Sequence, residues 1–148
     1  MEHFSPQQEK TDMQGMGYLI VHTSTAGGAI PIENAQIKIW NRRDAEDQSS
    51  LSGVRHILTS DRDGNTIRLP LPAPTRAISY TPGGIPYAYY NVDVSALGFY
   101  PQYFVDVPIY DGITSIQNAY LIPLPEGSVY SDSEPIGDTV VEGTNPLL

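Results

Sequence analysis

YAYYNVDVSA, residues 87–96, alternates side chains of two kinds, and this alternation decides the fold class of the chain. Successive side chains of a β-strand point to opposite faces, so the pattern predicts a strand with one buried face. The predicted inner face carries Tyr90, Val92 and Val94, and the outer face carries Tyr89, Asn91, Asp93 and Ser95. Such a strand has to cover its inner face with a second layer of structure.

Six further segments repeat the pattern and are predicted to be strands: residues 17–24, 35–41, 54–60, 65–71, 102–110 and 115–123. Residues 102–110 are expected to turn Tyr103, Val105 and Val107 to one face. Thirteen glycines and thirteen prolines supply the turns, and no amphipathic helix interrupts the series. We therefore expect an all-β fold, a single seven-stranded antiparallel Greek-key sandwich with disordered tails.

The sandwich is expected to cover residues 16–125, between a flexible segment at 1–15 and an acidic disordered tail at 126–148. A chain of 148 residues has room for one such domain. Its formal net charge of -9 lies mainly at the two ends, which leaves the body without the basic stripe that nucleic acid requires.

The N-terminus has no apolar run behind a basic start, so we expect no signal peptide and no membrane partner. The expected location is cytoplasmic synthesis, followed by incorporation into a spore, a cell wall or a phage-like particle. The absence of cysteine excludes disulfides, thiolate metal sites and cysteine nucleophiles.

The sequence DRDGN, residues 61–65, permits two interpretations. Alternating oxygen side chains before a glycine resemble half of a calcium loop, which would use Asp61, Asp63 and Asn65. An aspartate turn with Gly64 at positive φ explains the same residues without a metal, and the far-end glutamate of a calcium loop is missing. We favour the turn, between two strands of a hairpin, and expect no cofactor.

Eight aromatic residues crowd into residues 80–104, more than one strand face can bury. The aromatic side chains that are not buried in the core are expected to form an exposed binding patch, since amphipathic aromatic residues are common in protein interfaces. The candidate binding residues are Trp40, Tyr87, Tyr89, Tyr100 and Phe104. Aromatics that merely cover a sandwich edge and the proline-rich stretch at 70–86 are the alternative.

The segments GYLIVHTSTAGGAIPIENAQIKIW, LTSDRDGNTIRLPLP and YNVDVSALGFYPQYFVDVPIYDG follow in an order that resembles the carboxypeptidase regulatory-like domain, a prealbumin (transthyretin)-like sandwich. The last segment carries the pattern of Val92, Val94, Ala96, Gly98 and Phe99. The segments PIYDGITSIQNAYLIPLPEG and RLPLPAPTRA are most similar to the version found in clostridial-type bacteria beside spore cortex-lytic and peptidoglycan-binding proteins. This resemblance implies a non-catalytic module.

Enzymes also occur on related folds. Hydroxyisourate hydrolases use histidines and an arginine, and iron dioxygenases of related architecture use two tyrosines and two histidines. Here only His22 and His56 lie in the predicted sandwich, and nothing in their spacing requires them to converge. No short hydrolase, metalloprotease or phosphate-loop motif is present, so we expect no catalytic residues and no enzyme activity.

These observations favour a non-catalytic structural or protein-interaction module that binds a protein partner. A carbohydrate-binding module for peptidoglycan, with Trp40 and Tyr89 as stacking residues, is the first alternative. A small hydrolase of the hydroxyisourate type is the second.

Overall fold

The computed structural model describes residues 13–41 and 56–127. The predicted flexible segment 1–15 and acidic tail 126–148 therefore lie almost wholly outside the described residues. Within the described ranges, no helix has the length and apolar character needed to cross a membrane.

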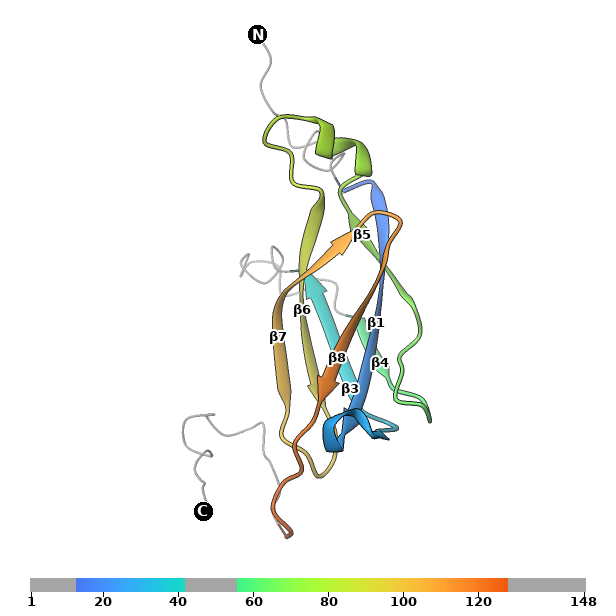
Figure 1. Ribbon diagram of the computed structural model, residues 1–148, viewed down its shortest axis with the longest axis vertical. Coiled ribbons are helices and arrows are strands. Elements are labelled where there is room, and N and C mark those ends of the chain that lie inside the picture. The colour runs from blue at the N-terminus through green and yellow to red at the C-terminus, as the bar shows by residue number, and fades with distance from the viewer. Residues whose placement is uncertain (1–12, 42–55, 128–148) are drawn as a thin grey trace.

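The described residues form eight strands and two short 3-10 helices (Figure 1). The strands are β1 (Gly15–Thr25), β2 (Ile30–Pro31), β3 (Gln36–Asn41), β4 (His56–Thr59), β5 (Leu69–Ala73), β6 (Tyr87–Ser95), β7 (Gln102–Tyr110) and β8 (Thr114–Tyr120). The 3-10 helices are η1 (Ala26–Gly28) and η2 (Arg76–Tyr80).

The strands make two sheets. In the first, β1 pairs with β8 on one side and with β5 and β2 on the other; the second has the order β4-β3-β6-β7. The predicted all-β fold with two layers is confirmed. The prediction of a wholly antiparallel sandwich is wrong, because β8 runs parallel to β1. After β7 a tight turn takes the chain across to the first sheet, so β8 lies beside β1 and forms no ladder with β7.

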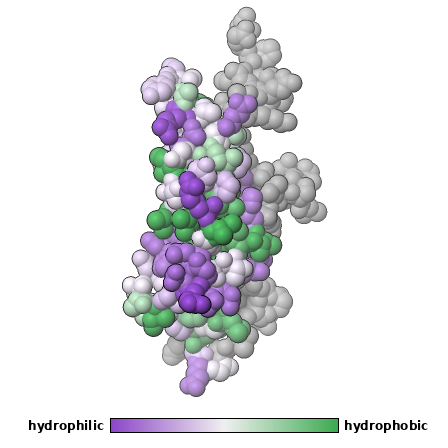
Figure 2. All heavy atoms as spheres, turned by 90° about the vertical axis from the view of Figure 1, so that its right-hand side faces the viewer, coloured by the Kyte–Doolittle hydropathy of each residue, from purple (hydrophilic) through white to green (hydrophobic). Residues whose placement is uncertain are grey.

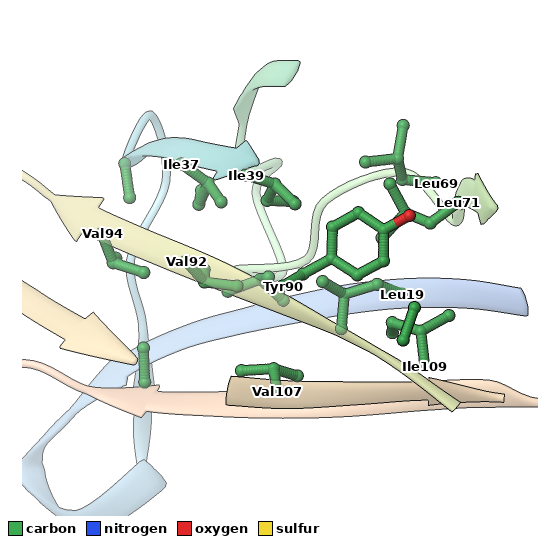
Figure 3. Packing of buried hydrophobic residues seen from close by; sticks show 14 of the residues in the cluster. Leu19, Ile37, Ile39, Leu69, Leu71, Tyr90, Val92, Val94, Val107 and Ile109 are labelled. Atoms are coloured by element: carbon green, nitrogen blue, oxygen red, sulfur yellow. The ribbon is translucent and has the colours of Figure 1, made fainter. Parts of the chain in front are cut away.

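The core lies between the sheets and consists of the faces that alternation predicts (Figure 3). Leu19 and Val21 from β1 and Ile37 and Ile39 from β3 are completely buried. Tyr90 of β6 inserts its ring into the same layer, and its hydroxyl donates to the carbonyl of Pro72 at 2.6 Å. That bond satisfies the one polar atom which this side chain brings into the core.

Strand β7 departs from the predicted alternation. Tyr103 and Val105 are 50% and 71% exposed, whereas Phe104 packs against the core. The cause is a bulge: the register with β6 shifts between Tyr90 and Val92, and Asp106 adopts a positive φ of 58°. A bulge inserts one residue and so reverses the faces on one side of it.

The two segments flanking residues 61–64 do not form the predicted hairpin. Strand β4 pairs with β3 in the second sheet, and β5 pairs with β1 in the first, so the turn connects the two layers. The proline-rich stretch is also more regular than expected, because β5 includes Pro70 and Pro72. These prolines fall at alternate positions, where their missing N–H groups would point away from β1.

Candidate functional site

Three tyrosines cluster on the outer face of the second sheet. Tyr87 and Tyr110 are directly opposite each other in the β6–β7 register, and Tyr89 follows on the same face of β6. The rings of Tyr87 and Tyr89 lie 5.0 Å apart with a tilt of 58°, and those of Tyr87 and Tyr110 lie 5.5 Å apart in an edge contact. The Tyr89 hydroxyl donates to the Tyr87 hydroxyl at 3.3 Å. We call Tyr87, Tyr89 and Tyr110 the tyrosine cluster.

Trp40 lies on the same face as the tyrosine cluster. It is directly opposite Asn91 in the β3–β6 register, and Asn91 is two residues along β6 from Tyr89. This diagonal position is within reach of aromatic side chains. Trp40 and the three tyrosines are all partly exposed. The structure therefore brings Trp40, Tyr87 and Tyr89 to one surface, as the sequence predicted.

The other two predicted binding residues do not belong to this surface. Tyr100 follows the far end of β6, about 26 Å along the strand from Tyr87, where its amide donates to the carbonyl of Ile122 at 2.9 Å. Phe104 faces the core because of the β7 bulge. Tyr110 was not among the predicted binding residues. Alternation continued from Val107 would have placed Ile109 on the inner face and Tyr110 on the outer face.

Residues 61–65 form a closed turn. Oδ1 of Asp61 accepts hydrogen bonds from the amides of Asp63 and Asn65, each at 2.9 Å, and Gly64 has a φ of 85°. The carboxylate oxygen that a calcium ion would use thus already holds the loop together. Among the described residues, no group of three or more histidine, aspartate or glutamate side chains could hold a metal ion.

The two histidines that we considered for catalysis lie in different places. His22 is on the outer face of β1, where its Nδ1 donates to Oδ1 of Asn65 at 2.7 Å. His56 begins the edge strand β4 and is directly opposite the buried Ile39, on the inner face of the other sheet. The first sheet separates the two side chains, so they do not share a site with each other.

The surroundings of Asp111 shift the pKa of its carboxyl group. The amide of Met16 donates to Oδ1 at 3.1 Å and the amide of Arg76 donates to Oδ2 at 3.0 Å. These two backbone hydrogen bonds, with a smaller contribution from the Arg76 charge, lower the pKa of Asp111 below its ordinary value. Asp111 therefore joins the start of β1 to the first residue of η2.

Apolar side chains are also exposed away from the tyrosine cluster. Figure 2 shows the side of the molecule on which β1 and the segment leading into β5 lie, with hydrophobic residues gathered in a band across the middle. On β8 and its flanks, Ile113, Ile116, Tyr120 and Ile122 are each at least half exposed. Sequence analysis treated this segment only as the last strand of the sandwich and did not identify it as a surface.

No protein-family model and no curated protein matches the sequence. Solved structures similar in fold include the 3-chlorocatechol 1,2-dioxygenase of Rhodococcus opacus 1CP, with 11% identity and a TM-score of 0.51 over 74% of this chain and 61% of the dioxygenase. The Bacillus anthracis TIE protein matches with 12% identity and a TM-score of 0.48, over 74% of this chain and 17% of that protein. A chlorocatechol 1,2-dioxygenase from Pseudomonas putida matches with 15% identity and a TM-score of 0.42, over 76% and 62% of the two chains.

The likeness to the Rhodococcus enzyme overturns the prediction that this chain is no enzyme, because an enzyme shares the fold. That prediction relied on short contiguous motifs. Catalytic residues that lie on separate strands form no short contiguous motif. The absence of such motifs therefore does not exclude an enzyme. At 11% identity the likeness shows the fold alone, and this chain spans less than two-thirds of each of the three matched chains.

Proposed function

We propose that this chain is a protein-interaction module whose binding face is the tyrosine cluster with Trp40 beside it. The observation that carries the proposal is the mutual packing of three partly exposed tyrosine rings on an outer sheet face. Tyrosine and tryptophan are enriched at interface hot spots, where they bury a large area. Rings already held by their neighbours lose little side-chain entropy when a partner binds.

The arrangement of the rings favours a protein partner over the peptidoglycan alternative. A sugar stacks on a ring face that lies open and flat. Here the rings meet at 58° and 63°, which produces a ridge instead of a platform. A ridge of aromatic edges and hydroxyls fits a pocket lined by both apolar and hydrogen-bonding groups, as protein interfaces provide.

The proposal also includes the type of β-sandwich to which the fold belongs. The order of segments in the sequence supports a prealbumin-like sandwich of the carboxypeptidase regulatory-like type, with Greek-key connections. The same resemblance supports a role in a spore, cell-wall or phage-like assembly.

The test is capture of a partner by the immobilised full chain and by a Tyr87→Ala/Tyr89→Ala variant. Anchor residues commonly cost at least about 2 kcal/mol when truncated, so the affinity for a captured protein should fall about 30-fold. Tyr80→Ala is the matched control, because Tyr80 is 85% exposed on η2 and is not a member of the tyrosine cluster.

Thermal melting has to show that the double variant stays folded, as expected for side chains outside the buried core. Capture that is equally strong with the double variant would refute the proposal. Binding of wild type to purified peptidoglycan alone, lost in the double variant, would replace it with the carbohydrate-binding alternative.

A further inference from the structure

The edge strands of the sandwich differ in how well they are protected from pairing with another chain. An unprotected edge presents a row of free backbone groups, which proteins usually blunt with prolines, bulges, charges or very short strands. Strand β5 contains Pro70 and Pro72, β7 has its bulge at Asp106 and a proline at Pro108, and β4 is only four residues long. Strand β8 has none of these features: its seven residues, TSIQNAY, include neither proline nor a charged side chain.

The backbone of β8 directs alternate groups away from β1. The amide of Leu121 donates to the carbonyl of Ser24, and the carbonyl of Ile113 accepts from the amide of Tyr18. Odd-numbered residues therefore bond to β1, and the even-numbered residues of β8 direct their N–H and C=O groups to the other side. Beside residues 114–118 the described residues supply no strand on that side. Beyond β8, the amide of Tyr100 donates to the outward carbonyl of Ile122, and a single bridge joins Phe99 to Pro123.

Two of the outward carbonyls of β8 accept hydrogen bonds from glutamine side chains. Nε2 of Gln102 donates to the carbonyl of Tyr120, and Nε2 of Gln117 donates to that of Asn118 at 3.1 Å. Both glutamine side chains are long and part-exposed, so a backbone donor from another strand can replace them. The hydrogen-bond partners of these two outward carbonyls are thus side chains that are easily displaced.

The partner that fits this edge is an uncharged strand of similar length with some apolar side chains on its outer face. Ile116 and Tyr120 are 63% and 51% exposed on the outer face of β8, and no charged residue lies between Asp111 and Glu126. A chain with a net charge of -9 repels its own copies except where they meet on a neutral surface. Strand β8 is itself an uncharged strand of the required length, with Ile116 and Tyr120 exposed on its outer face.

We propose that two copies of this chain pair through antiparallel β8 strands, which joins their first sheets into one continuous sheet. A two-fold axis near the middle of β8 brings outward backbone groups opposite outward backbone groups, as an antiparallel ladder requires. No like charges meet across the axis. This surface is separate from the tyrosine cluster, so the inference goes beyond the proposed function.

Sedimentation of the full chain over a wide concentration range tests the proposal. Wild type should show a reversible monomer–dimer equilibrium. Ile116→Lys places two like charges near the axis and should raise the dimer dissociation constant at least about tenfold. Ile57→Lys is the matched control, because Ile57 is 60% exposed on the edge strand β4, and it should leave the equilibrium unchanged.

A second variant, Asn118→Pro, removes an outward amide without touching the β1–β8 ladder and should weaken the dimer to a similar extent. A wild-type chain that stays monomeric at every concentration would overturn the proposal, and so would a dimer that survives both β8 variants. Dimers lost on Tyr87→Ala/Tyr89→Ala but not on Ile116→Lys would place the contact on the tyrosine cluster and also overturn it. Partner capture by Ile116→Lys reports on the proposed function separately.

Discussion

Replacing Gly64 with alanine should destabilise the sandwich more than its turn conformation alone explains. Gly64 has a φ of 85°, and a Cβ there would overlap the backbone carbonyl of Thr23 and come within 3.2 Å of Cβ of Pro31. The carbonyl of Gly64 also accepts a hydrogen bond from the amide of Thr23 at 2.7 Å. The single hydroxyl proton of Thr23 is shared between the carbonyl of Ile32 at 2.8 Å and that of Gly64 at 3.1 Å. The turn is therefore pressed directly against β1.

The expected loss has two parts. A non-glycine residue in the left-handed region costs about 1–2 kcal/mol. Relief of the overlap requires the turn to move away from Thr23, which weakens the amide hydrogen bond, worth about 1 kcal/mol, while the Thr23 hydroxyl keeps the carbonyl of Ile32 as its acceptor. The sum is about 2–3 kcal/mol for Gly64→Ala.

Gly98→Ala provides the matched control. Gly98 has nearly the same φ of 88°, but a Cβ there meets no atom within 4 Å, so only the conformational cost of about 1–2 kcal/mol applies. Urea unfolding should give Gly64→Ala a midpoint about 0.5 M below that of Gly98→Ala, at equal slopes. Equal midpoints for the two variants would refute the inferred contact between the turn and β1.

Two further predictions concern single side chains. Because the pKa of Asp111 is lowered in the folded state, its stabilising contribution should be present above its ordinary value of 3.8 and be lost as pH falls through the folded pKa. The melting temperature of wild type should thus exceed that of Asp111→Asn near neutral pH and converge with it in strong acid. A wild-type melting temperature that is still higher in strong acid would contradict the lowered pKa of Asp111. Ser24 is completely buried and its Oγ has no hydrogen-bond partner among the described residues, so Ser24→Ala should leave stability unchanged or raise it by up to about 1 kcal/mol in urea unfolding. A loss of more than that would show that the hydroxyl has a partner.

The sequence alone placed most of the strands, although not β2, and for most of those it placed it also gave the buried face. Alternation is a local property with a period of two, so residues 17–24, 35–41 and 87–96 could be assigned without knowing their neighbours. The turn at residues 61–64 was equally predictable, since aspartate and glycine satisfy it within five residues. Trp40, Tyr87 and Tyr89 could be placed together for the same reason: each lies outward on a strand whose inner face is unmistakable.

Only the tertiary structure decided which strands pair and where the alternation breaks. The β7 bulge turned Phe104 inward and Tyr103 outward, because one extra residue exchanges the inner and outer faces of the strand beyond it. No local sequence pattern predicts this bulge. The parallel pairing of β8 with β1 depends on contacts between residues about 95 positions apart, as does the exposure of the β8 edge. Alternation shows that a strand has an inner face. The free energy that selects the neighbouring strand comes from long-range packing of the two sheets. A pattern with a period of two carries no information about which strand that neighbour is.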